Sequence, residues 1–316
     1  MNVRATSSSF PTLLGQQLAQ LTSRQTALQT EAATGQRVTD PSDDPRAMRQ
    51  VLDLQNQISN LQQYQTNIAS MNDTLTASYT VAQSLQKVTD RAGELATGVD
   101  GTSTPDQLQA DGAEVNQLLE QTLQLANTQS QGTYLYGGTQ NQTPPYTATR
   151  DAAGNITAIT YNGNTTVPQA EISSGSTVSV TVPGTNTSGA GPSGLFADSR
   201  TNTDVFNHLI SLRDHMLSGT PADVAAVNQT DLPTLIKDGG AVTNYVSNVG
   251  SVQSRLDTAT SYAKDRVTSL DGLVSNAANA DLATTLVALN ETQNAYSAAL
   301  KTGGTILSTS LLDYLK

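Results

Sequence analysis

Residues 34–45, which read TGQRVTDPSDDP, decide how the first part of this chain folds. Gly35 is a typical residue for ending a helix, and Pro41 and Pro45 bracket a turn. Asp44 followed by Pro45 has the pattern of a helix N-cap followed by proline at the first helical position. We therefore expect a tight turn between two helices, built by Pro41, Asp43, Asp44 and Pro45.

Helices are predicted on both sides of this turn. The helix before it has apolar residues at heptad spacing, namely Leu14, Leu18, Leu21, Leu28 and Ala32. The helix after it is much longer, because heptad spacing continues from Val51 to Leu85, and we expect it to end near Gly98. Thr104 and Pro105, with Gln107 two residues later, begin a third helix as in a capping box.

Heptad spacing returns in the second half of the chain. Asp204 and Thr220 each begin a helix, and a stripe from Val242 to Ala277 predicts a long one. Arg266 occupies one position of that stripe, where an apolar residue is expected. A last stripe follows, made of Leu282, Leu286, Leu289, Tyr296, Leu300, Gly303, Leu307 and Tyr314.

Residues 134–200 have a different pattern. They are rich in Gly, Thr, Asn, Pro and Ser, and short alternating stretches at 156–161 and 177–182 are separated by turn residues. This pattern predicts a small all-β domain, and its few apolar residues indicate a thin core and an outward-facing position.

These patterns predict a mainly α protein with a β insert. We expect a long antiparallel, coiled-coil-like helical rod formed from both termini, with a small all-β outer domain. The predicted regions are the terminal helices (1–40 and 281–316), a long helical bundle (41–133 and 201–280) and the β domain (134–200).

The composition limits which functions are possible. Hydrophobic residues make up 36% of the 316 residues and aromatic residues only 4%, which suits narrow seams between helices better than one large core. The net charge of -11 opposes binding to nucleic acid or to an anionic membrane. The chain has no cysteine, and its N-terminus lacks the apolar run of a cleaved signal peptide.

The positions of the stripes favour assembly with other chains. A helix of about 20 residues is marginal alone, and two paired helices leave part of each other's surface uncovered. An ordinary intramolecular bundle is the alternative. The predicted assembly interface comprises Leu14, Leu18, Leu21, Leu28, Leu286, Leu289, Tyr296, Leu300, Leu307, Leu311 and Tyr314.

No group of residues indicates catalysis, a cofactor or a metal site. His208 and His215 lie seven residues apart, or about 10 Å along a helix, which is too far for one ion, so we expect a solvated face. Asp43 and Asp44 are better explained by the turn than by acid–base chemistry. The glycine pair 303–304 lacks the context of a phosphate loop and indicates close helix packing. We predict that the protein is not an enzyme.

Three motifs point to a known family. They are TGQRV followed by PSDDP (34–38 and 41–45), Asn127 followed by GTYLYGGT (132–139), and SLLDYL (310–315). These resemble the TGKR…PSDDP, N…GxYLFxG and SLxDYL signatures of the hook-associated protein 3 family, the hook–filament junction branch of the flagellin superfamily. Gln36 and Tyr136 depart from the usual Lys and Phe.

This resemblance implies a structural role. It implies a subunit that joins hook to filament by self-assembly into a tubular layer, beside hook-associated protein 1 and flagellin. The terminal helices would line the inner tube, and the variable β insert would project outward. It also implies type III export to the extracellular flagellum without a cleaved signal peptide, with an export chaperone at the C-terminal region.

Two other functions remain possible at this point. The chain could be flagellin itself or a minor filament subunit. In a different class, it could be a secreted surface adhesin whose β insert is the binding module.

Overall fold

The computed structural model describes residues 9–314, and the side chains of residues 11–306. Contacts divide these residues into two compact units. The terminal unit comprises residues 9–60 and 266–314, and the central unit comprises residues 61–265. Each unit is described by itself below.

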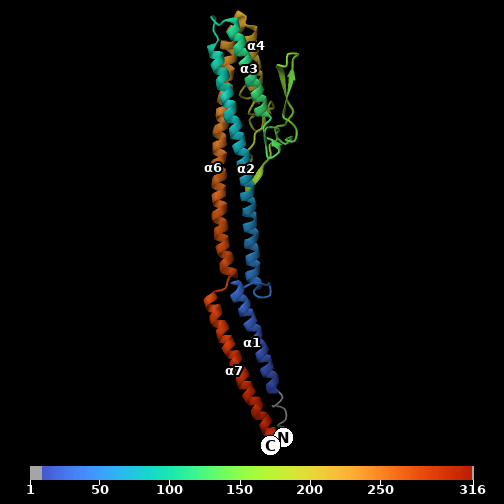
Figure 1. The fold of residues 1–316 in the computed structure, drawn as a ribbon, viewed down its shortest axis with the longest axis vertical. Coiled ribbons are helices and arrows are strands. Elements are labelled where there is room, and N and C mark those ends of the chain that lie inside the picture. Colours follow the sequence, from blue (N-terminus) through green and yellow to red (C-terminus); the bar gives the residue numbers. More distant parts are fainter. Residues whose placement is uncertain (1–8, 315–316) are drawn as a thin grey trace. The chain divides into compact units, whose positions relative to one another are not determined.

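The terminal unit is built from helices at both ends of the chain. Helix α1 (Ser9–Thr34) lies beside α7 (Leu282–Tyr314) and runs antiparallel to it (Figure 1). The unit also contains the beginning of α2 (Pro45–Gly98) and the end of α6 (Leu232–Ala278). The predicted long helices on both sides of a β insert are therefore confirmed.

The central unit contains the rest of α2 and α6 and the shorter helices between them. These are α3 (Pro105–Ala126), α4 (Val205–Ser218), α5 (Pro221–Ala226) and a π turn (Val227–Asp231). The predicted helix starts are confirmed. The side chain of Thr104 accepts a hydrogen bond from the Gln107 amide (3.3 Å), that of Thr220 from the Asp223 amide (3.3 Å), and that of Asp204 from the Asn207 amide (3.2 Å).

The strands between α3 and α4 are short. They are β1 (Gln129–Ser130), β2 (Thr133–Tyr134), β3 (Tyr146–Arg150), β4 (Ile156–Tyr161), β5 (Ala170–Ser173), β6 (Ser176–Val178), β7 (Thr185–Asn186), β8 (Ala197–Asp198) and β9 (Thr203–Asp204). The first six form three antiparallel pairs, and the last three form a mixed sheet in which β7 and β8 are parallel. The strand-rich segment thus spans 129–204, slightly more than the predicted 134–200.

The insert shares its core with the helices of the central unit. Tyr146 and Phe196 of the insert are buried against Phe206 of α4, and Tyr136 is buried against Phe196, with ring centroids 5.1–5.7 Å apart. The same core includes Leu85 of α2, Leu119 of α3, Leu209 of α4 and Leu235 of α6. The chain thus places several of its few aromatic residues together in this core.

Arg266 does not lie in the seam of α6. The buried and half-buried positions run through Ala263, Val267 and Leu270, so the seam shifts by one residue at this point. An insertion of four residues into a heptad pattern produces such a shift. Arg266 is consequently exposed, and the expectation that it occupies the seam was wrong.

No helix within residues 9–314 is long and apolar enough to cross a membrane.

Candidate assembly interface

The turn after α1 is held together by its two aspartates. The Asp43 carboxylate accepts hydrogen bonds from the amides of Asp40 (2.9 Å) and Thr39 (3.1 Å), which lower the pKa of Asp43. Asp44 accepts from the amides of Arg46 and Ala47, both at 3.1 Å, and so caps α2 ahead of its first residue, Pro45. The two side chains complete a backbone turn and are placed for structure rather than for acid–base chemistry.

The same turn is bonded to the loop between α6 and α7. The amides of Arg37 and Val38 both donate to the Ala278 carbonyl, at 2.7 and 3.3 Å, and the Arg37 guanidinium donates to the Ala277 carbonyl at 3.0 Å. The Ala280 amide donates to the Gly35 carbonyl at 2.9 Å. The TGQRV motif therefore joins the end of α1 to the end of α6, because its residues donate hydrogen bonds to the last carbonyls of α6. The sequence patterns did not predict this role.

The apolar stripe of α1 faces α7. Its half-buried positions within the described side chains are 14, 18, 21, 25, 28, 31 and 32, which lie on one side of the helix. They include the predicted interface residues Leu14, Leu18, Leu21 and Leu28. In the free chain these leucines are thus used mainly for the contact with α7.

The stripe of α7 divides into two edges. One edge packs toward α1 and consists mostly of small residues: Thr285, Thr292 and Gly303 are buried, and Leu289, Tyr296 and Ala299 are half-buried. The other edge, here called the leucine edge, comprises Leu282, Leu286 and Leu300, which are 49%, 49% and 48% exposed. The predicted stripe is therefore only partly used against α1, and the predicted interface residues Leu286 and Leu300 remain exposed. Leu307, Leu311 and Tyr314 lie beyond the described side chains.

Gly303 allows α7 to approach α1 closely. A Cβ atom at position 303 would overlap the Leu14 side chain, whereas one at Gly304 would meet nothing within 4 Å. The expected packing role of the glycine pair therefore belongs to Gly303.

This difference gives a matched pair of substitutions. Gly304→Ala is expected to stabilise the α1–α7 pair by about 1 kcal/mol, because alanine favours the helix. Gly303→Ala gains the same propensity but loses about 1–3 kcal/mol to overpacking against Leu14. Amide hydrogen exchange of α7 in the two variants should show faster opening in Gly303→Ala. Equal protection in both would contradict the assigned packing.

The two units differ in charge. Residues 61–265 contain 18 acidic and 8 basic residues, whereas the rest of the chain contains 9 and 8. The acidic excess therefore lies almost entirely in the central unit. A nearly neutral surface with exposed leucines is suited to association, while a strongly acidic one favours solubility.

The Asn127 motif fixes the insert to α3. The Asn127 side chain donates to the Tyr146 carbonyl (2.9 Å) and accepts from the Tyr146 amide (3.0 Å), as a neighbouring strand would. Gly138 has a φ of 65°, and a Cβ there would overlap Asn164, so only glycine fits. The motif therefore has a structural role at the base of the insert.

The histidines do not form the solvated face that was expected. His208 Nδ1 lies 2.7 Å from the buried carboxylate of Asp238, and His215 Nδ1 lies 2.6 Å from that of Asp231. Within the described residues, no cluster of three or more His, Asp and Glu side chains could hold a metal ion. The aspartates were missed because they lie 16 or more residues from their partners.

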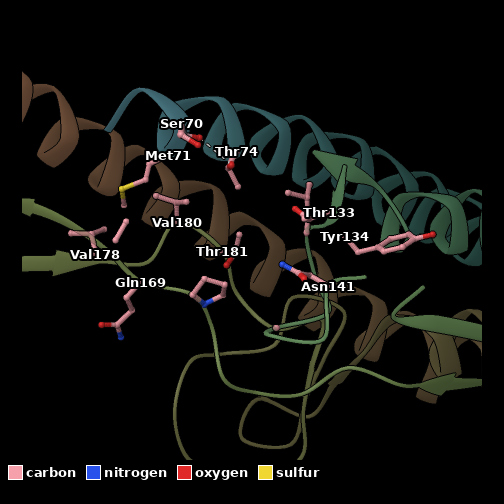
Figure 2. Close-up of a pocket in the computed structure, with 14 residues that line it drawn as sticks. Ser70, Met71, Thr74, Thr133, Tyr134, Asn141, Gln169, Val178, Val180 and Thr181 are labelled. Carbon is pink, nitrogen blue, oxygen red and sulfur yellow. Dashed lines mark hydrogen bonds between the residues drawn. The ribbon is translucent and has the colours of Figure 1, made fainter. Parts of the chain in front are cut away.

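One cavity between α2 and the insert is small and has no charged lining residue. Figure 2 shows a cavity of about 220 Å³ between α2, which contributes Ser70, Met71 and Thr74, and the insert, which contributes Thr133 and Asn141 among others. None of its lining side chains is charged. Its volume is below the roughly 300–1,000 Å³ of typical ligand sites, so it is better explained as loose packing of the insert.

A comparison with protein-family models matches residues 12–141 to the bacterial flagellin N-terminal helical region. The matched segment begins in α1 and includes the turn, α2, α3 and the Asn127 motif, so the predicted resemblance to the flagellin superfamily is confirmed over these residues. No curated protein matches the chain.

Solved structures of flagellar proteins have a similar fold. One is a Vibrio parahaemolyticus protein named as a flagellar hook-associated protein, with 20% identity and a TM-score of 0.64, covering 75% of this chain and 100% of that one. Another is FlgL of Bacillus cereus, with 23% identity and a TM-score of 0.54, covering 69% and 97%. The flagellar junction protein FlgL of Legionella pneumophila has 15% identity and a TM-score of 0.56, covering 72% and 99%. These likenesses establish the flagellin-like fold of long helices with a small strand-rich insert.

Proposed function

We propose that this protein is a structural subunit of the bacterial flagellum that joins hook to filament. The observation that carries the proposal is the flagellin N-terminal region within a fold similar to FlgL structures, one of which is named as a junction protein. The PSDDP turn supports the junction branch, because it is held by two aspartates and begins α2 with a proline.

In this proposal the terminal unit makes the assembly contacts. Its α1 leucines pair with α7 inside one subunit, and the leucine edge of α7 contacts a neighbouring subunit in a tubular layer. Leu307, Leu311 and Tyr314 continue the interface toward the C-terminus. The nearly neutral charge of the terminal unit supports this division, because like charges do not oppose its association.

The neighbours and the export route follow from the family. Hook-associated protein 1 and flagellin would lie on the two sides of the layer, and a chaperone would hold the C-terminal region before type III export to the extracellular flagellum. The β insert would face outward. The acidic charge of the central unit, to which the insert belongs, would keep the exposed surface soluble.

Electron microscopy of flagella labelled with an antibody to this chain tests the proposal. We expect label confined to a narrow band between hook and filament. Label along the whole filament would instead identify a flagellin or a minor filament subunit. The adhesin alternative predicts that the isolated insert binds a ligand, and loss of the protein would then leave filament growth intact.

A further inference from the structure

A polar seam joins α4 to the π turn and the start of α6. On the α4 side it comprises Asp204, His208, Ser211 and His215, whose spacing of 4, 3 and 4 residues places them on one face. On the other side it comprises Asp231 and Asp238, seven residues apart. A heptad pattern of polar side chains thus lies where helix seams normally have apolar ones.

Both carboxylates on the side of the π turn and α6 are buried. Asp231 is 1% exposed, and its two oxygens bind Ser211 Oγ (2.8 Å) and His215 Nδ1 (2.6 Å). Asp238 is fully buried, and its two oxygens bind the Asp204 amide (3.2 Å) and His208 Nδ1 (2.7 Å). A buried carboxylate is costly unless it is hydrogen-bonded and its charge is compensated.

The charged groups around the imidazoles are mostly acidic. His208 is surrounded by Asp238, Asp204 and Asp231, and His215 by Asp231 and Asp223. Arg213, on the same helix, is bonded instead to Asp214, Asn116 and the Ile156 carbonyl. Arg213 is therefore not a partner of the two buried carboxylates, whose hydrogen-bond partners that can carry a positive charge are the imidazoles.

We propose that the polar seam is a proton-dependent contact that holds α4 on α6 when the imidazole of His208 is protonated and loosens as this ring loses its proton. A protonated imidazole supplies both a hydrogen bond and a compensating charge, and charge-assisted hydrogen bonds are about twice as strong as neutral ones. The His208 side chain is 17% exposed, so its proton can exchange with water. The inference concerns the closure of the central unit and does not depend on flagellar assembly.

The direction of the effect follows from His208. Burial alone would lower its pKa, but the hydrogen bond to Asp238 and the charges of Asp238, Asp204 and Asp231 outweigh burial and raise the pKa. A raised folded-state pKa gives stabilisation that is fully present below the unfolded value of about 6.5 and is lost as pH rises through the folded value. The titration of His208 can change the opening equilibrium by at most about tenfold per pH unit.

The double variant His208→Asn/His215→Asn provides the test in the full chain. The asparagine amide nitrogen replaces imidazole Nδ1 as a donor, but it does not titrate. Hydrogen exchange of α4 amides, corrected for intrinsic rates, should show opening that increases between pH 6 and 9 in the native protein and stays constant in the variant. Amides of α2 in the central unit serve as an internal reference.

A second measurement does not depend on the variant folding. Nitrogen NMR of the native protein should show His208 remaining protonated above pH 6.5, with its proton on Nδ1 after titration. A pKa at or below 6.5 for His208 would overturn the proposal. So would an α4 opening equilibrium with the same pH dependence in the native protein and the double variant.

Discussion

Replacing both Leu286 and Leu300 with serine is expected to raise the protein concentration needed for assembly about 30-fold. These two residues of the leucine edge are 49% and 48% exposed, so about half of each side chain is still available for burial. Full burial of a leucine contributes about 1.5–3 kcal/mol, so each remaining half contributes about 1 kcal/mol and both about 2 kcal/mol.

To measure this, purified protein at increasing concentration is mixed with isolated hooks that lack it. The hooks are then pelleted, and the bound fraction of the protein is determined. Thermal unfolding should change little, because neither leucine packs toward α1. Ile236→Ser is a matched control, since Ile236 is 65% exposed but belongs to the acidic central unit. An unchanged concentration for the double variant, or an equal effect of the control, would rule out the leucine edge as the contact.

Replacing Arg213 with methionine is expected to lower the free energy of unfolding of the central unit by about 3 kcal/mol. Arg213 is 3% exposed, and its Nη1 donates to the Ile156 carbonyl (2.6 Å) and to Asn116 Oδ1 (3.1 Å). It therefore joins α4 to β4 and α3. Methionine fills much of the same space but leaves these acceptors without their donor.

Urea unfolding followed by near-ultraviolet circular dichroism would measure this loss, because Tyr136, Tyr146 and Tyr161 all lie in the central unit. Arg213→Lys keeps the charge and one donor but not the planar group, so a smaller loss is expected. A change below about 1 kcal/mol for Arg213→Met would show that water or a neighbouring side chain replaces the guanidinium.

Much of the fold could be predicted from local patterns. Heptad spacing and caps such as Thr104–Pro105 determine where helices form, because they act within one or two turns. Alternation and turn residues identify the insert in the same way. The family motifs could also be recognised in the sequence, but their structural role could not. Arg37 in the first motif bonds a carbonyl that lies 240 residues away.

Short-range spacing was enough to predict the helices and the insert, and the motifs carried the resemblance to the flagellin superfamily. Which edge of the α7 stripe meets α1 could not be predicted in this way, because it depends on packing in three dimensions. A heptad pattern marks a stripe, but the close approach at Gly303 and the small side chains of Thr285 and Thr292 turn one edge of it inward. The pairing of His208 with Asp238 was likewise decided by packing, because a buried charge selects its partner in space rather than along the chain.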